Sequence, residues 1–291
     1  YPESVLTAEG WTFFEAAVAW LVASPDDFIG SAALIASNDT LSAGFDGALY
    51  DRLVSLGYDV QVVTGSDVKD GAFTIADAES KDLLVISESI GSGDIVNIKG
   101  AAVNIIHMEA FGWDKMGWQP GGNRGWTDPL TGVIDITSAK HTILSSAGLT
   151  AGPLDWFTVD SLQATYIKKY NLTPGSIILA EKNDSLVISW AMEKGTVQAD
   201  GNPAAARIVT FPLPGYGSYP ESVLTAEGWA FFDAAVGWST PPPSTGEIEP
   251  GIVSRYEFER GVGDKEGRFN GSIEGDAAIV EDPETGPCRH G

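Results

Sequence analysis

Apolar strand-like runs alternate with helical stretches along the first half of the chain. Four segments have the pattern of buried or half-buried strands: residues 31–38, 58–65, 82–89 and 101–109. Two segments between them have the apolar spacing of helices: residues 42–57 and 75–80. Strands that alternate with helices favour right-handed crossovers. The pattern therefore predicts an α/β fold with a parallel sheet that helices cover on both faces.

The second half of the chain has shorter strand-like runs, which follow a loop rich in Gly and Trp at residues 112–129. These runs are residues 132–137, 154–159, 164–170, 176–181, 185–193 and 205–213. The fourth and fifth runs are joined around Lys182-Asn183-Asp184, and this arrangement predicts a β-hairpin.

One segment of the chain occurs twice. Residues 1–20 and 219–238 are identical at 17 of 20 positions. In the second copy Thr225 is a favourable N-cap, and Trp229 and Phe232 lie on one face of a helix of about fourteen residues. Because a strand pattern precedes it, the second copy is predicted to be the closing helix of a domain.

The first copy has the same apolar face, made by Trp11, Phe14, Val18 and Leu21. No strand pattern precedes it, so residues 1–23 are predicted to be the closing helix of a preceding unit in a tandem array with a period of 218 residues. The alternative is a duplicated helix without a parent array. Since the second copy fills the corresponding groove, the first is expected to pack against another unit and to link chains into a homo-oligomer or a head-to-tail polymer.

Shifts in composition mark the remaining boundaries. Residues 29–239 form the predicted α/β domain, and residues 240–251 are a proline-rich linker. In residues 252–291 short strands and Gly turns replace helices, which indicates an all-β segment, an incomplete jelly-roll or lectin-like module. The chain starts without Met or a signal peptide, so we expect a processed product or a piece of a longer protein.

The charge balance narrows the range of partners. Asp and Glu number 40 against 17 Lys and Arg, for a net charge of −23. Such a surface repels nucleic acid and anionic lipid, so neither is expected, and no run of about 18 apolar residues predicts membrane insertion. The sequence indicates no cofactor, although an acidic surface leaves Ca²⁺ open as a ligand. Cys288 is the one cysteine, so no disulfide can form within the chain.

Four Asn-x-Ser/Thr sequons are candidate glycosylation sites of a secreted chain. They are Asn38, Asn171, Asn183 and Asn270. The motif is also common by chance, so unmodified Asn side chains are the alternative.

Six segments together carry a family resemblance. They read ALIASN, LYDRLVSLGYDVQVV, DLLVISESI, HMEAFGW, AKHTILSSAGL and LTAEGWAFFDAAVGW. The unit that contains them resembles the class I glutamine amidotransferase-like, flavodoxin-like domains of large secreted bacterial proteins. The stretch RYEFERGVGDKEGRFNGSIEG near the C-terminal end resembles the start of a laminin-G-like (concanavalin-A-like) module. The two resemblances imply a flavodoxin-like sheet and an extracellular or cell-surface location.

The resemblance also implies where chemistry would occur. In active members of the amidotransferase superfamily a Cys on the turn after the third strand acts with a distant His. Here that turn contains Ser87, Glu88 and Ser89 and no Cys. A Ser nucleophile needs a base to activate it and an oxyanion site beside it. His107 and His141, the His residues of this unit, are expected to be structural, so the chain is predicted not to be an enzyme.

A cleft at the carboxyl ends of the strands is the candidate binding site, because ligands of open α/β sheets bind there. Its candidate residues are Asn38, Ser87, Glu88, His107 and Glu109. His107 and Glu109 are two residues apart in a strand pattern and so face one side, where they could meet a metal together with Glu88. No spacing motif supports such a site, so no metal is predicted, and hydrogen-bonded loop anchors are the alternative.

Three tryptophans lie in the long loop at Trp113, Trp118 and Trp126. Aromatic side chains on a loop can stack on sugars, pin the loop to its own domain, or be buried in a neighbouring unit. We favour the last two roles.

The main functional hypothesis is a non-catalytic extracellular structural or adhesive repeat protein that assembles through interdomain or intersubunit contacts, with a filament as one form. The second hypothesis is a carbohydrate-binding or carbohydrate-active surface protein with glycans as partners. The third is a degenerate amidotransferase-like hydrolase that uses Ser87 or Ser89.

Overall fold

The computed structural model describes residues 28–41, 44–122, 124–126, 133–136, 141–158, 164–211, 213 and 221–240. The chain divides into two compact units between Pro241 and Pro242, and the described residues all belong to the first unit. Several predictions lie outside them: the helix at residues 1–23 with Trp11, Phe14, Val18 and Leu21, residues 241–251 of the linker, the β segment at residues 252–291, and Asn270.

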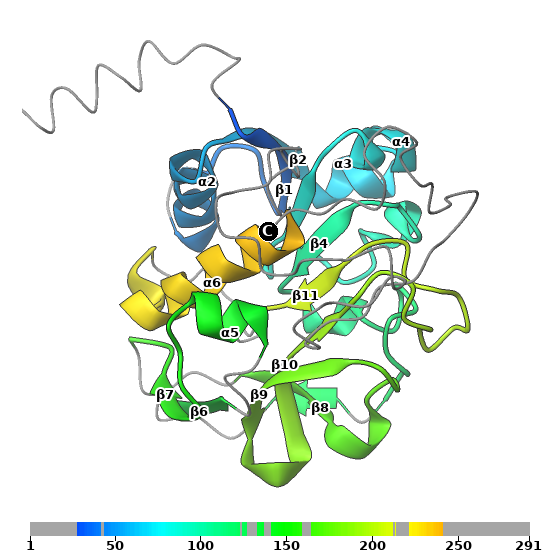
Figure 1. Cartoon of the computed structure of the whole chain (residues 1–291). Coiled ribbons are helices and arrows are strands. Elements are labelled where there is room, and N and C mark those ends of the chain that lie inside the picture. The colour runs from blue at the N-terminus through cyan, green and yellow to red at the C-terminus, as the bar shows by residue number, and fades with distance from the viewer. Residues whose placement is uncertain are drawn as a thin grey trace, which may run out of the picture. The chain divides into compact units, whose positions relative to one another are not determined.

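Five parallel strands form one half of the sheet (Figure 1). From the edge inward they are β2 (Tyr58–Thr64), β1 (Gly30–Ala36), β3 (Leu83–Ile86), β4 (Asn104–His107) and β11 (Ile208–Thr210). Numbered along the chain within this half, their order is 2-1-3-4-5, which is the flavodoxin-like order. The fold is therefore flavodoxin-like, and the α/β prediction is confirmed.

Antiparallel strands extend the sheet beyond β11. In spatial order they are β10 (Leu186–Met192), β9 (Ile177–Lys182), β6 (Val133–Ile136) and β7 (Gly152–Asp155), and β8 (Thr165–Lys168) pairs with both β10 and β5 (Arg124–Trp126). The predicted hairpin is confirmed as β9 and β10. Asn183 in its turn has a φ of 55°, a left-handed conformation that Asn tolerates better than most residues.

Helices cover both faces of the parallel half (Figure 1). One face carries α2 (Phe45–Ser55), α5 (Thr142–Ser146) and α6 (Ala226–Ser239), and the other carries α3 (Gly65–Lys69) and α4 (Ile75–Glu79). Single 3₁₀ turns are η2 (Val96–Ile98), η3 (Ala110–Gly112), η4 (Lys169–Asn171), η5 (Asn183–Ser185) and η6 (Glu221–Val223). Both cores thus lie between the sheet and a helical layer.

Helix α3, which has five residues, was absent from the sequence prediction. A capping box starts it: the hydroxyl of Thr64 accepts the backbone N–H of Asp67, and the carboxylate of Asp67 accepts the N–H of Thr64. Thr74 and Asp77 form the same box at the start of α4. The repeated Thr-x-x-Asp spacing is therefore the local signal that begins both short helices.

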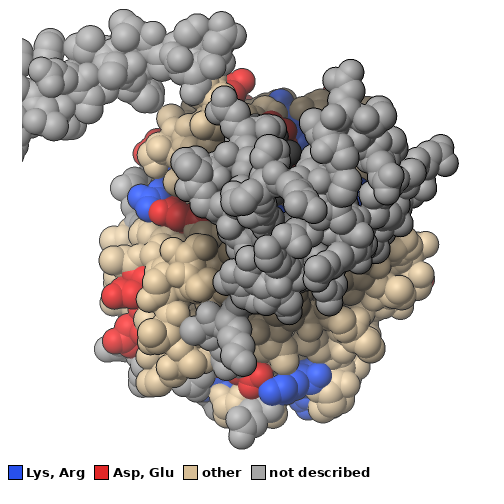
Figure 2. Space-filling model, in the orientation of Figure 1, with Lys and Arg blue, Asp and Glu red and all other residues tan. Residues whose placement is uncertain are grey.

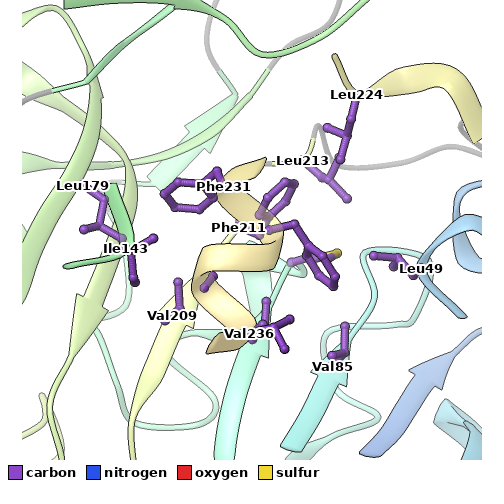
Figure 3. Close-up of a cluster of buried hydrophobic side chains, with 14 of the residues drawn as sticks. Leu49, Val85, Ile143, Leu179, Val209, Phe211, Leu213, Leu224, Phe231 and Val236 are labelled. Carbon is purple, nitrogen blue, oxygen red and sulfur yellow. The ribbon is translucent and has the colours of Figure 1, made fainter. Parts of the chain in front are cut away.

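The first core lies between the sheet and the face that carries α2, α5 and α6. Figure 3 shows Phe231 and Val236 on α6, with Phe211 next to them and with Leu49 of α2 and Val85 of β3 across the cluster. All five side chains are buried, and the rings of Phe211 and Phe231 lie 5.7 Å apart between centroids. The second copy of the repeated segment is therefore the closing helix of this domain, as predicted.

Helix α6 lies very close to Trp156 at one point. The hydroxyl of Thr225 caps the helix by accepting the N–H of Gly228 at 3.1 Å, and the N–H of Thr225 donates to the carbonyl of Trp156. A Cβ atom added to Gly228 would lie 2.5 Å from Cδ1 of Trp156 and 2.8 Å from its carbonyl oxygen. Only glycine therefore allows this approach.

Two glycine substitutions in α6 are expected to have opposite effects. Gly228→Ala should lower the free energy of unfolding by about 1–3 kcal/mol, because the new methyl group meets backbone and a fully buried indole. Gly237→Ala on the exposed side of α6 meets nothing within 4 Å, so it should raise stability by about 0.5–1 kcal/mol. Urea unfolding of both variants measures the difference, and equal effects would contradict this packing.

The second core lies on the face that carries α3 and α4. It contains Ile86 and Ile105 from the strands together with Trp113 from the loop after β4. The ring of Trp113 packs edge-on against Trp190 of β10 with centroids 5.6 Å apart. The long Gly/Trp loop is thus folded onto the sheet.

Candidate functional site

The candidate site is the edge at which β1 and β3 end. β1 lies between β2 and β3, so the chain leaves β1 toward one side of the sheet and leaves β3 toward the other. In sheets of this kind ligands bind in the crevice outside the carboxyl ends of the strands at such a switch point. The turns at residues 37–41 and 87–94 and the start of α2 form this region, which we call the switch-point edge.

Two serines and an aspartate form a hydrogen-bonded network at the switch-point edge. Oγ of Ser87 donates to Oδ1 of Asp46 at 2.5 Å, and Oγ of Ser89 donates to Oδ2 of Asp46 at 2.7 Å. The backbone N–H of Ser37 donates to Oγ of Ser89 at 3.0 Å. The network joins the turns after β1 and β3 to the first turn of α2, and both serine hydroxyls direct their protons to one carboxylate.

The turn after β3 lacks the backbone of a nucleophile elbow. In such an elbow the nucleophile lies on a strained turn between a strand and a helix, where backbone N–H groups can stabilise an oxyanion. Among the described residues the non-glycine residues with positive φ are Leu41 and Asn183, so none of Ser87, Glu88 and Ser89 has a positive φ. The element that follows β3 is the single 3₁₀ turn η2 and not an α-helix.

His107 and Ser87 lie on opposite faces of the sheet. His107 on β4 is in register with Ile86 on β3, and Ser87 is the next residue after Ile86. Successive side chains of a strand point to opposite faces. Accordingly, Ser87 bonds to Asp46 of α2 in the first layer, while His107 contacts Trp118 of the second. The sheet therefore separates the serine from this imidazole.

His107 lies inside the second core and not in the predicted cleft. The side chain is fully buried, its ring meets Trp118 edge-on at 4.8 Å, and a Cβ added to Gly112 would lie 3.1 Å from its Nε2. Within the described residues neither ring nitrogen has a hydrogen-bond partner. Burial lowers the pKa of His107 to about 3, so the ring is neutral at physiological pH.

Glu109 is the acid near this edge whose pKa is most altered. The residue is 7% exposed, and its Oε1 accepts the backbone N–H of Phe111 at 2.8 Å. Burial raises the pKa of Glu109 to about 7, although the hydrogen bond from Phe111 and the charges of Lys115 and Arg124 oppose the rise. A carboxyl group that titrates near neutral pH is typical of a functional site, and buried structural acids show the same behaviour.

The remaining predicted residues are Asn38 and Glu88. Asn38 is exposed, and its Oδ1 accepts the N–H of Thr40 at 3.2 Å within the turn after β1. Glu88 is 6% exposed. The sequence reasoning missed Asp46, although an acid in the first turn of a predicted helix next to a strand end is a usable signal.

The tryptophans of the long loop serve as packing residues. Trp113 and Trp118 are 2% and 3% exposed, so neither ring is available to stack on a sugar. Of the two favoured roles, the structure supports the one in which these side chains pin the loop to its own domain, because both belong to the second core. The side chain of Trp126 lies outside the described residues.

The sequons differ in accessibility. Asn183 is exposed and its Oδ1 accepts the N–H of Ser185 at 3.1 Å, whereas Thr173 of the Asn171 sequon is buried and donates its hydroxyl to the carbonyl of Trp118. An acceptor sequon in an exposed loop is the form suited to modification. The exposed positions Asn38 and Asn183 therefore fit glycosylation better than Asn171.

The described surface carries both charge signs. Figure 2 shows acidic and basic side chains scattered singly or in small groups among uncharged residues on the visible part of that face. Within the described part of the chain, no three His, Cys, Asp or Glu side chains lie close enough together to hold a metal ion. None of the described helices is long and apolar enough to cross a membrane.

Among known proteins, this chain has distant structural similarity to solved structures. No protein-family model matches the sequence, and no curated protein is significantly similar to it. The solved structures that match include the following three. A cytoplasmic protein from Salmonella typhimurium LT2 is 15% identical, with a TM-score of 0.44 over 72% of this chain and 97% of the other. A protein named as a GMP synthase component from Thermoplasma acidophilum is 10% identical, with a TM-score of 0.40 over 72% and 94%. PurLQS from Thermotoga maritima is 9% identical, with a TM-score of 0.35 over 72% and 98%.

The main functional prediction requires correction. None of these structures is named as an extracellular structural or adhesive repeat protein, and the first is named as a cytoplasmic protein. The prediction of such a repeat protein is therefore wrong. The flavodoxin-like part of the predicted resemblance agrees with the strand order, whereas a laminin-G-like module has no counterpart among the three named structures.

Proposed function

We propose that this chain is a degenerate amidotransferase-like domain that does not catalyse acyl transfer and whose switch-point edge binds a small polar ligand. The observation that carries the proposal is the pair of hydrogen bonds from Ser87 and Ser89 to Asp46. These bonds make the two serines parts of a rigid turn. The edge therefore lies where the resemblance places an amidotransferase active site, but its two serines are not free to act as nucleophiles.

Two requirements of acyl transfer, a base and an oxyanion site, support the non-catalytic part of this proposal. A Ser nucleophile needs a base that takes its proton, and the group to which Ser87 and Ser89 donate is the carboxylate of Asp46 and not an imidazole. The nearest strand imidazole, His107, projects into the other layer. An oxyanion site needs N–H groups of an elbow, and the turn after β3 leads into a 3₁₀ turn.

The binding part of the proposal is supported by the location and polarity of the edge. Parallel strands end there at the point where the strand order reverses, and the turn at residues 37–41 exposes the amide of Asn38. Carbohydrate recognition through the long loop is not favoured, because Trp113 and Trp118 are buried.

Hydrolysis by the Ser87→Ala/Ser89→Ala double variant tests the proposal. Release of ammonia from glutamine and of nitrophenol from nitrophenyl acetate should be equal, within about twofold, for the wild type and the double variant. Removal of a working serine nucleophile lowers turnover by about 10⁴-fold or more. A fall of even tenfold in the double variant, with an unchanged melting temperature, would mean that one of these serines is a nucleophile.

A further inference from the structure

Helix α6 covers a surface formed by α2, α5 and the sheet, which we call the α6 site. The residues that α6 buries there are Gly228, Phe231, Phe232, Ala235, Val236, Trp238 and Ser239. The rings of Phe231 and Trp156 lie 4.5 Å apart between centroids, and Asp233 forms an ion pair with Arg52 of α2. The α6 site therefore requires a helix that combines a glycine at one point of contact with aromatic side chains at others.

The first copy of the repeated segment keeps every residue within the repeat that α6 buries. Gly10, Phe13, Phe14, Ala17, Val18 and Trp20 correspond in order to the buried residues of α6 from Gly228 to Trp238. The copies differ at three positions, where Thr12, Glu15 and Ala19 stand in place of Ala230, Asp233 and Gly237. None of these three residues of α6 is buried. A helix formed by residues 7–20 can therefore make the same core contacts as α6.

The tether of the first copy is long enough for it to reach the α6 site of its own chain. Its Val22 corresponds to Thr240, whose hydroxyl bonds to that of Tyr58 at the end of α6. A Cβ added to Gly30, at the start of β1, would lie 3.2 Å from Cε1 of Tyr58. The end of α6 and the start of β1 are therefore neighbours. The chain between Val22 and Gly30 extends to about 26 Å at most, which is enough to join them.

The two positions that follow the repeat favour α6 as the usual occupant. Ser239 is fully buried, and its counterpart Leu21 has a larger side chain, which a packed core accommodates at a cost. Val22 has no hydroxyl and cannot form the hydrogen bond that Thr240 makes with Tyr58. The first copy therefore matches the α6 site in its apolar face and is the weaker of two competitors.

We propose that residues 7–20 replace α6 in the α6 site of the same chain as the minor of two occupants. The tether gives the first copy a high effective concentration at this site, so a contact within the chain is favoured over one between chains. The domain then has two alternative closing helices. This exchange is independent of the function proposed for the switch-point edge.

Chemical crosslinking of the full chain tests the exchange. In a Cys288→Ser background, a bismaleimide joins Arg52→Cys to Asp233→Cys when α6 occupies the site, and joins Arg52→Cys to Glu15→Cys when the first copy does. The first pair should crosslink in most molecules and the second in a smaller fraction, both within single chains. Lys69→Cys with Glu15→Cys is the matched control, because Lys69 is exposed on α3, on the opposite face of the sheet, and should not crosslink.

Substitutions at one matched pair of phenylalanines show whether the crosslink reports the proposed contact. Phe13→Asp should reduce the crosslink between positions 15 and 52 to the level of the control, because a charged side chain is disfavoured at the fully buried position of Phe231. Phe231→Asp should increase the same crosslink by about threefold or more, since it weakens the competing helix.

Each result decides for or against the exchange. A crosslink between positions 15 and 52 that equals the control, or that Phe13→Asp leaves unchanged, would overturn the proposal. The same crosslink found only between chains, as a doubled mass on a denaturing gel, would also overturn it and would indicate exchange between chains. A Phe231→Asp chain that fails to fold would show that the first copy does not replace α6.

Discussion

Relative to the wild type, the variant His107→Leu should gain stability as the pH falls from 6.5 to 3. Burial lowers the pKa of His107 from 6.5 to about 3. Below pH 6.5 the unfolded chain binds a proton at this residue while the folded chain does not, so the folded state of the wild type becomes less stable as the pH falls. The full difference corresponds to about 5 kcal/mol, a large part of the stability of a typical domain.

Urea unfolding at a series of pH values measures this effect. Leucine keeps the volume in the second core and removes the titrating group, so the difference in stability between His107→Leu and the wild type should grow as the pH falls over this range. His141→Gln is the matched control: His141 is half-buried, and burial lowers its pKa too, so its variant should flatten the profile only slightly. If both variants change the dependence of stability on pH equally, His107 is not a buried imidazole with a strongly lowered pKa.

The variant Glu109→Gln should be more stable than the wild type at pH 8 by about 3 kcal/mol. Burial raises the pKa of Glu109 from 4.5 to about 7. Between these values the unfolded chain releases the proton while the folded chain retains it, so stability falls as the pH rises. Glutamine has the shape of the protonated acid and keeps an oxygen for the N–H of Phe111. The gain should therefore disappear below pH 4.5.

Thermal unfolding of Glu109→Gln at pH 4 and pH 8 separates burial from a general charge effect. Glu227 is an exposed acid in the first turn of α6, so Glu227→Gln should change stability by no more than about 0.5 kcal/mol at either pH. A gain for Glu109→Gln of the same size at both pH values would show that Glu109 is not a buried acid with a raised pKa.

The parallel half of the sheet was predictable from the sequence because its signals are local. Buried strands such as β1 and β3 are continuous apolar runs, and α2 ends at Ser55, two residues before Gly57, which has a φ of 89°. Apart from the hairpin of β9 and β10, the antiparallel half was predicted only as separate runs, because the pairing of β6 with β9 joins residues that are far apart in the chain. The pairing of β11 with β4 likewise depends on tertiary contacts and not on a local sequence signal.

The candidate site was predictable in its location and not in its contacts. The turn with Ser87 follows a strand, so its position at the carboxyl edge could be inferred. The hydrogen bond from this serine to Asp46 was not predictable, because it forms only when α2 packs on β1 and β3. The register between β3 and β4 decides to which face of the sheet Ser87 and His107 point. No local sequence pattern specifies this register.

The most direct test of the central claim is to restore the missing nucleophile. If the switch-point edge lacks a base and an oxyanion site as well as a cysteine, Ser87→Cys should release no more ammonia from glutamine than the wild type does. Its thiol should have a pKa of about 8.5 or higher, since the carboxylate of Asp46 disfavours a thiolate beside it. Measured glutamine hydrolysis by Ser87→Cys at the wild-type background is the predicted result. Turnover at least tenfold above that background would contradict a non-catalytic domain.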